Sequence, residues 1–166
     1  LDDSKRLDAP AREHLDREIR RRAVAWAIGI VEAPVIDARD ILRASLEAMR
    51  MAVIALDPPP DALLVDAVQV PGVKLPQVPV IHGDALSGCI AAASIVAKVH
   101  RDGLLDGLAR RYPAYGFEQH KGYGTPEHWV ALERCGPCPE HRLTYHGVVP
   151  GAGGDPIGSR AARRRG

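Results

Sequence analysis

The sequence predicts an α/β fold, in which helices pack against a sheet. Three short apolar runs, at residues 24–31, 62–65 and 78–81, have the length and the composition of buried strands. Longer stretches between and after these runs carry apolar residues at helical spacing. Strands separated by helices in this way are typical of a layered domain with one shared core.

The sequence predicts four helices. In the first two, apolar residues recur every three or four positions and form one face, and in the third, small residues at positions 91–93 would allow close packing on a sheet. The predicted helices cover residues 11–23, 42–56, 87–111 and 126–134. Pro58 ends the second helix and Pro113 ends the third. We expect one domain over residues 1–149 and a disordered Gly/Arg-rich tail over residues 150–166.

The composition excludes several classes of protein. Because 22 basic residues face 21 acidic ones, no basic excess indicates a nucleic-acid partner, and such a partner has to be argued from motifs. No apolar run reaches the roughly 18 residues of a membrane-spanning helix. Three cysteines are too few, and odd in number, for a secreted disulfide framework. A soluble cytoplasmic protein is therefore expected.

Two aspartates stand where predicted strands end. Asp66 closes the run at residues 62–65, and Asp84 follows the run at residues 78–81 after a short loop. In α/β proteins the sites lie at such strand ends. If the two strands are neighbours, the carboxylates converge, and a divalent cation such as Mg²⁺ or Mn²⁺ would relieve their repulsion. The alternative is that each aspartate only caps the segment that follows it.

A loop at residues 119–125 combines a cation, an aromatic ring and two glycines. Lys121 could bind phosphate, and Tyr123 could stack on a sugar or a base. Glycine-rich turns are common, so an ordinary turn is the alternative here. His14, His100 and His128 lie in helical stretches and are assigned no role.

Cys135 and Cys138 form a C-x-x-C pair, which occurs both in thiol-redox sites and in zinc sites. The context disfavours redox chemistry, because this pair follows a helix instead of opening one. His141 and His146 could complete a zinc set, although His141 stands unusually close to Cys138 in the sequence. An incidental loop is the preferred interpretation.

Taken in order, several segments resemble ribonuclease HII, the type 2 ribonuclease H. The matching segments are DSKRL at 3–7, DILRASLEAM at 40–49, LVD at 64–66, GD at 83–84, IAAASIVAKV at 90–99, YPAYGF at 112–117, HKGYGT at 120–125 and HR at 141–142. The resemblance implies a ribonuclease H-like mixed sheet flanked by helices, with four carboxylates that bind two Mg²⁺ or Mn²⁺ ions. It also implies an endonuclease that hydrolyses the RNA strand of RNA–DNA hybrids and nicks duplex DNA at single ribonucleotides, leaving 5′-phosphate and 3′-hydroxyl ends.

The resemblance also assigns roles to individual residues. Asp66 and Asp84 would be the third and fourth metal-binding carboxylates. Tyr123 would stack beside the ribonucleotide and help to sense its 2′-hydroxyl. Lys5, Arg6 and Lys121 would contact phosphates. A complete enzyme of this kind is expected to be a monomer.

The sequence departs from the family pattern at several positions. It contains neither the adjacent Asp-Glu pair nor the Gly-Arg-Gly loop with which the family opens, so we expect a chain that lacks its first strand and has little or no activity by itself. Ala67 stands where Gly is usual, and Ala85 where Ser is common. The alternative function is a non-catalytic nucleic-acid-binding fragment.

Overall fold

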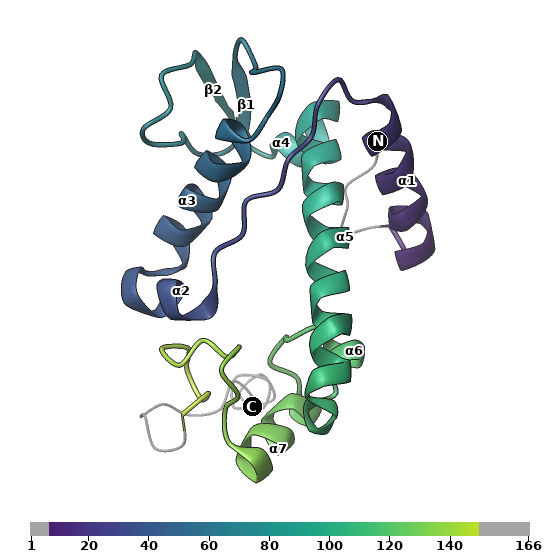
Figure 1. Ribbon diagram of the computed structural model, residues 1–166, viewed down its shortest axis with the longest axis vertical. Helices are drawn as coiled ribbons and strands as arrows, with labels where there is room; N and C mark the ends of the chain where they lie inside the picture. Colours follow the sequence, from purple (N-terminus) through teal and green to yellow (C-terminus); the bar gives the residue numbers. More distant parts are fainter. Residues whose placement is uncertain (1–6, 150–166) are drawn as a thin grey trace, which may run out of the picture. The chain divides into compact units, whose positions relative to one another are not determined.

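The computed structural model describes residues 7–149 of the chain (Figure 1). This part divides into two compact units: the first comprises residues 7–31 and 39–104, and the second comprises residues 32–38 and 105–149. The long helix α5 (Gly88–Arg111) contributes to both units. Lys5, Arg6 and the predicted tail at residues 150–166 lie outside the described residues.

The first unit contains helices and a small sheet. Its elements are α1 (Ala9–Arg22), α3 (Ile41–Ile54), β1 (Leu63–Asp66), β2 (Gln77–Val80), α4 (Gly83–Leu86) and the N-terminal part of α5. Aspartate caps begin α1 and α3, because the Asp8 carboxylate accepts a hydrogen bond from the Ala11 N–H and that of Asp40 from the Arg43 N–H, both at 2.8 Å. The helices predicted for this unit are thereby confirmed, with small shifts at their ends.

The two strands pair in parallel, with Leu63 opposite Gln77 and Asp66 opposite Val80. The side chain of Gln77 closes the connection between the strands, since it accepts from the Val70 N–H at 2.8 Å and donates to the Val70 carbonyl at 3.0 Å. Both predicted strands are confirmed to within about a residue, and their parallel pairing brings their C-terminal ends to one edge.

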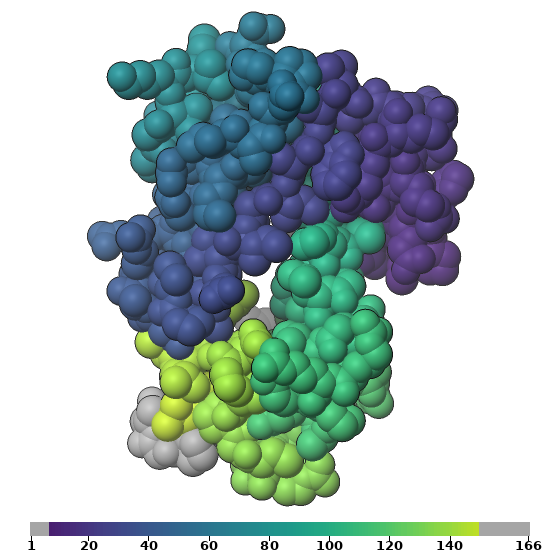
Figure 2. All heavy atoms as spheres, viewed as in Figure 1, coloured from purple at the N-terminus to yellow at the C-terminus, as the bar shows by residue number. Residues whose placement is uncertain are grey.

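The strand predicted at residues 24–31 is wrong, because this segment is extended but forms no ladder with the other described strands. It lies along α3, and Gly29 contacts the Ala48 backbone, so the segment is held by helix packing (Figure 2). Val24 is 88% exposed and Ile30 is 48% exposed, so the apolar run is not the fully buried strand that its composition suggested. An apolar run can be extended without a partner strand, and periodicity does not distinguish the two cases.

The second unit is built from short helices around an aromatic core. Its elements are α2 (Ala33–Arg39), the C-terminal part of α5, the 3₁₀ helix η1 (Pro113–Tyr115), α6 (Phe117–His120) and α7 (Pro126–Cys135). Tyr115 and Phe117 are buried with their rings stacked at 5.3 Å, and Ala131 and Leu132 of α7 pack in the same cluster. Of these elements, the sequence predicted α5 and α7 but not the shorter helices. Within residues 7–149, no helix has both the length and the apolarity needed to cross a membrane.

Candidate functional site

The two predicted aspartates lie at the same edge of the sheet. Asp66 is the last residue of β1, and Asp84 lies in α4, which begins directly after β2 and packs against both strands. Asp66 is exposed and Asp84 is half-buried. The parallel pairing therefore fulfils the condition under which the sequence predicted that these carboxylates converge.

A hydrogen bond ties the two strand ends together. The N–H of Gly83 donates to Oδ1 of Asp66 at 2.9 Å, so the residue before Asp84 is held on the Asp66 carboxylate. Gly83 is buried, and a Cβ there would come within 2.5 Å of Cδ1 of Ile90 and 3.4 Å of Oδ1 of Asp66. Glycine thus allows α4 to approach the strand end without displacing the side chain of Ile90.

The backbone turns sharply as it leaves each strand. Ala67 and His82 both adopt left-handed conformations, with φ of 57° and 56°. Ala67 still donates its N–H to the Val80 carbonyl at 3.0 Å, so the turn begins within the ladder. The left-handed φ gives a physical reason why glycine would suit position 67 better than alanine.

The chemistry of this edge fits a divalent cation in the type of its donors. Carboxylate oxygens are the ligands that Mg²⁺ prefers, and they also suit Mn²⁺. Within the part of the chain that the structure describes, no group of three or more His, Cys, Asp or Glu side chains is arranged to hold a metal ion. By donor type, Asp66 and Asp84 are candidate ligands for such a cation.

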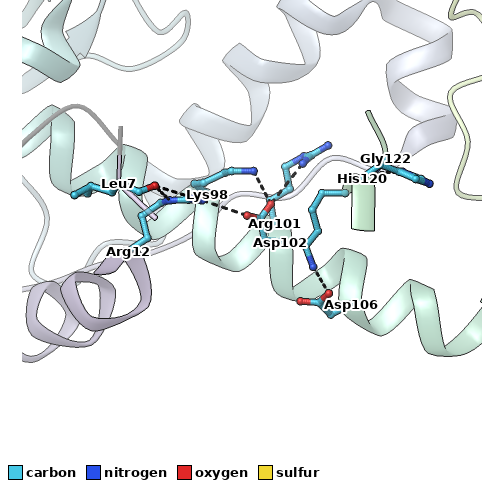
Figure 3. A network of polar contacts seen from close by, with 9 residues as sticks. Leu7, Arg12, Lys98, Arg101, Asp102, Asp106, His120 and Gly122 are labelled. Atoms are coloured by element: carbon cyan, nitrogen blue, oxygen red, sulfur yellow. Dashed lines mark hydrogen bonds and ion pairs between the residues drawn. The ribbon is translucent and has the colours of Figure 1, made fainter. Parts of the chain in front are cut away.

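The predicted loop with Lys121 and Tyr123 lies in the second unit. Lys121 forms an ion pair with Asp106 of α5, the residue labelled in Figure 3. Lys121 and Gly122 both have left-handed backbones, with φ of 49° and 73°, and the Tyr123 side chain is 58% exposed. The loop therefore presents an exposed aromatic ring beside a half-buried lysine that is paired with Asp106.

A charged cluster in the first unit surrounds Asp102 of α5. Figure 3 shows this carboxylate among three basic side chains, with Lys98 at 2.7 Å, Arg12 at 3.5 Å and Arg101 at 3.7 Å. Arg12 also donates to the Leu7 carbonyl. These contacts join α1 to α5 and indicate a structural role for Asp102.

The cysteines do not form the zinc set that the sequence left open. Cys135 and His146 are exposed, whereas Cys138 and His141 are buried in the second unit. Burial raises the pKa of the Cys138 thiol, which favours its neutral form. A neutral, buried thiol is a poor nucleophile, and among the described residues no group of three or more His, Cys, Asp or Glu side chains is arranged around Cys138 to hold a metal ion, so the incidental-loop interpretation fits Cys138 better.

Sequence reasoning missed three buried histidines beneath the Tyr123 loop. His120, His128 and His141 are only 8%, 6% and 7% exposed, and they lie around the ring of Phe117. The sequence assigns no role to His128, and it offers His141 as a possible zinc ligand and as part of a segment that matches the family. The sequence shows only that these histidines lie before and after the loop. That spacing does not predict a contact between them, because the contact forms only when α6 and α7 pack together.

The family model and the relatives that match this chain all carry the same family description. A family model described as "Ribonuclease HII" matches residues 1–148. The chain is 51% identical over 157 residues to ribonuclease HII of Anaeromyxobacter sp. (strain Fw109-5), covering 95% of this chain and 50% of that protein. It is 48% identical over 163 residues to ribonuclease HII of Rhodococcus erythropolis (strain PR4 / NBRC 100887), covering 98% and 71%. It is 56% identical over 145 residues to ribonuclease HII of Geobacillus kaustophilus (strain HTA426), covering 87% and 55%.

The chain thus spans between half and about seven-tenths of the length of these relatives. Among solved structures, it is similar to the crystal structure of ribonuclease H2 from Pyrococcus horikoshii OT3, with a TM-score of 0.76 at 24% identity. That match covers 88% of this chain and 77% of the other. The fold class expected from the sequence is therefore confirmed.

Proposed function

The chain belongs to the ribonuclease HII family, and from that premise we propose that it supplies part of the active site of a metal-dependent endonuclease. Its substrates are the RNA strand of RNA–DNA hybrids and duplex DNA that contains single ribonucleotides. The observation that carries the proposal is the placement of Asp66 and Asp84 at one sheet edge, held by the bond from Gly83.

Asp66 and Asp84 are the residues that would hold Mg²⁺ or Mn²⁺. The chemistry that two such ions would supply, if these carboxylates held them, is activation of a water for attack on the phosphate and stabilisation of the leaving 3′-oxygen. Tyr123 would stack beside the ribonucleotide, and its exposed ring supports this role. Lys121, Lys5 and Arg6 are proposed to contact phosphates, and Lys121 would exchange its ion pair with Asp106 for one with the nucleic acid.

These 166 residues include no adjacent Asp-Glu pair and no Gly-Arg-Gly loop. We therefore expect the 166-residue polypeptide, taken alone, to cleave little or not at all. Nucleic-acid binding without cleavage is the second candidate function of this polypeptide. The exposed Tyr123 and the neighbouring Lys121 support it, because neither depends on a complete metal site. A cytoplasmic location stays a prediction.

The test uses the 166-residue chain with a duplex that contains one ribonucleotide and with a matched all-DNA duplex. Cleavage is followed on gels in Mg²⁺, Mn²⁺ or EDTA, and binding is followed by fluorescence anisotropy at several salt concentrations. Binding of Mn²⁺ is measured separately by calorimetry. The variants are Asp66→Asn and Asp84→Asn, with Asp61→Asn as the matched control, because Asp61 is exposed and lies outside the strand-end site.

Mn²⁺ binding that Asp66→Asn and Asp84→Asn weaken, and Asp61→Asn leaves unchanged, would support the metal assignment. Salt-dependent binding in EDTA without cleavage would support the binding-only function of this polypeptide. Metal-dependent nicking that requires Asp66 would contradict the expected inactivity. Failure to bind Mn²⁺ and either duplex would overturn both candidate functions.

A further inference from the structure

The loop that carries Tyr123 rests on a chain of hydrogen bonds between buried histidines. The chain begins at Cys138, whose backbone N–H donates to Nδ1 of His141 at 2.9 Å. The same Nδ1 lies 3.0 Å from the Cys138 sulfur and 3.3 Å from the Cys138 carbonyl oxygen, which can only accept. The shortest of the three contacts is with the N–H, which can only donate, and it favours an Nδ1 without a proton. This places the proton of the neutral ring on Nε2.

The next link joins the two rings, with Nε2 of His141 3.1 Å from Nε2 of His128. Because His141 carries its proton at this atom, it donates and His128 accepts. The far side of His128 requires the same assignment independently. Its Nδ1 lies 2.9 Å from the Tyr123 carbonyl, which can only accept, so Nδ1 must carry the proton. The bond to the Tyr123 carbonyl thus specifies donation from His141 through His128 to Tyr123, and the short bond from the Cys138 N–H agrees with this direction.

His120 holds the other side of the same loop. Its Nδ1 accepts from the Gly122 N–H at 3.2 Å, and its Nε2 donates to the Tyr115 carbonyl at 2.7 Å. Its own backbone carbonyl accepts from the Tyr123 N–H at 2.9 Å. The rings of His120 and His128 stack at 4.3 Å with an interplanar angle of 13°. Both backbone groups of Tyr123 are therefore bonded to histidines, and its carbonyl also accepts from the Thr125 N–H at 2.9 Å.

The chain of donors requires neutral rings. A second proton on His128 would point its Nε2–H at the Nε2–H of His141, and a second proton on His141 would point at the Cys138 N–H. Burial lowers the pKa of both histidines, which agrees with neutral rings near pH 7. The other titratable groups around the two rings are His120, Cys138, Tyr115 and, near the Cys138 thiol, Glu140.

We propose that His128, oriented by His141, is a positioning residue that sets the backbone of Tyr123 and thereby aims its ring at the ribonucleotide. The inference rests on the proposed function, because it assigns Tyr123 its role in substrate recognition. His128 acts through the Tyr123 carbonyl and does not itself touch the substrate. The opposing possibility is that His128 only fills space beside Phe117, from which its ring centroid is 5.6 Å.

Three substitutions separate these roles. In His128→Asn, the amide nitrogen occupies roughly the place of Nδ1, so the variant keeps a donor for the Tyr123 carbonyl. In His128→Gln, the longer side chain places its amide near the position of Nε2, toward His141, so the donor to Tyr123 is lost. His128→Leu keeps apolar volume and removes both bonds. His14→Leu is the matched control, because His14 is exposed on α1. Tyr123→Ala shows what complete loss of the ring does.

Three measurements are made on the 166-residue chain. Two-bond ¹H–¹⁵N NMR spectra report which ring nitrogen carries each proton. Amide hydrogen exchange at Tyr123 and Thr125 reports how firmly the loop is held. Anisotropy gives the ratio of affinities for the ribonucleotide-containing and the all-DNA duplex. Circular dichroism checks that each variant keeps its helices.

The expected tautomers are Nδ1–H for His128 and Nε2–H for His141. His128→Leu and His128→Gln should lower the preference for the ribonucleotide about five- to tenfold, the effect of one lost hydrogen bond, and should speed exchange at both amides. His128→Asn should retain most of the preference, and Tyr123→Ala should abolish it. The opposite tautomers would overturn the proposal, as would equal effects of Asn and Leu or an equal loss of affinity for both duplexes.

Failure of the proposed function has a different signature. If the parent chain shows no preference and Tyr123→Ala changes nothing, Tyr123 does not recognise the ribonucleotide and the functional role assigned to His128 falls with it. The tautomers and the amide exchange still decide whether His128 holds the loop, because neither needs a substrate. Unchanged exchange in a folded His128→Leu variant would overturn that positioning role as well.

Discussion

Replacement of Gly29 by alanine should strongly destabilise the first unit. Gly29 lies in the extended segment beside α3, and an added Cβ would meet the backbone of Ala48. It would come within 2.7 Å of the Ala48 carbonyl carbon and 3.0 Å of its Cα, and closer still to the carbonyl oxygen, at a distance that real Cβ atoms essentially never show. The obstacle is backbone, so no side chain can rotate away from it.

The size of the effect follows from this geometry. To restore ordinary contacts, residues 24–31 and α3 would have to separate by more than an ångström. Ala44, one turn before Ala48 on α3, is only 2% exposed, so the separation would open packing at a buried position. Overpacking typically costs about 1–3 kcal/mol, and an immovable backbone obstacle places Gly29→Ala near the upper end, at about 3 kcal/mol.

The assay is urea unfolding followed by tryptophan fluorescence. The sequence has two tryptophans, Trp26 in the first unit and Trp129 in the second, so a Trp129→Phe background makes the signal specific for the first unit. The control is Gly103→Ala in α5, where a Cβ meets nothing within 4 Å and where alanine should stabilise the helix by about 1 kcal/mol. If Gly29→Ala shifted the free energy of unfolding by less than about 0.5 kcal/mol, the packing argument would be refuted.

Three further predictions concern other positions. Ala67→Gly should stabilise the first unit by about 0.5–1 kcal/mol, because glycine removes the strain that a Cβ causes in a left-handed backbone. Part of this gain is lost, because glycine also raises the conformational entropy of the unfolded chain. An unchanged urea midpoint would contradict the prediction. Asp37→Ala should destabilise the second unit by about 1–2 kcal/mol. The Asp37 carboxylate accepts three hydrogen bonds: from the Thr144 N–H at 3.0 Å, from the Thr144 hydroxyl at 2.7 Å and from the Leu143 N–H at 2.8 Å. Equal urea midpoints for the variant and the parent would show that these bonds do not stabilise the unit. The folded-state pKa values of His128 and His141 are lowered by burial, so their contribution to stability should be complete above about pH 6.5 and should decrease as the pH falls below it, by at most about 1.4 kcal/mol per pH unit for each ring. Urea midpoints read from Trp129 fluorescence at pH 7.5 and 5.5 check this, and a midpoint that does not fall at the lower pH would refute it.

Much of the fold could be predicted from local patterns. The helices α1 and α3 followed from periodicity, because a helix that buries one face carries a local apolar pattern. The long helix α5 has no such one-sided pattern, and its end was predicted from Pro113. The short helices α2, α4, α6 and η1 could not be predicted, since a single turn has too little periodicity and forms only where its neighbours pack. The segment at residues 24–31 was misassigned because an apolar run does not reveal whether a strand or a helix lies beside it.

The candidate site divides in the same way. The sequence by itself determined the residue types with metal and nucleic-acid chemistry, Asp66, Asp84 and Tyr123, because their placement at strand ends and in a glycine loop is local. The tertiary structure alone decided that Gly83 binds Asp66 across the parallel edge. It alone also brought His128 and His141 together beneath Tyr123. Those contacts join residues from separate elements, and the partner of a polar group is chosen only when burial leaves it no water to bind.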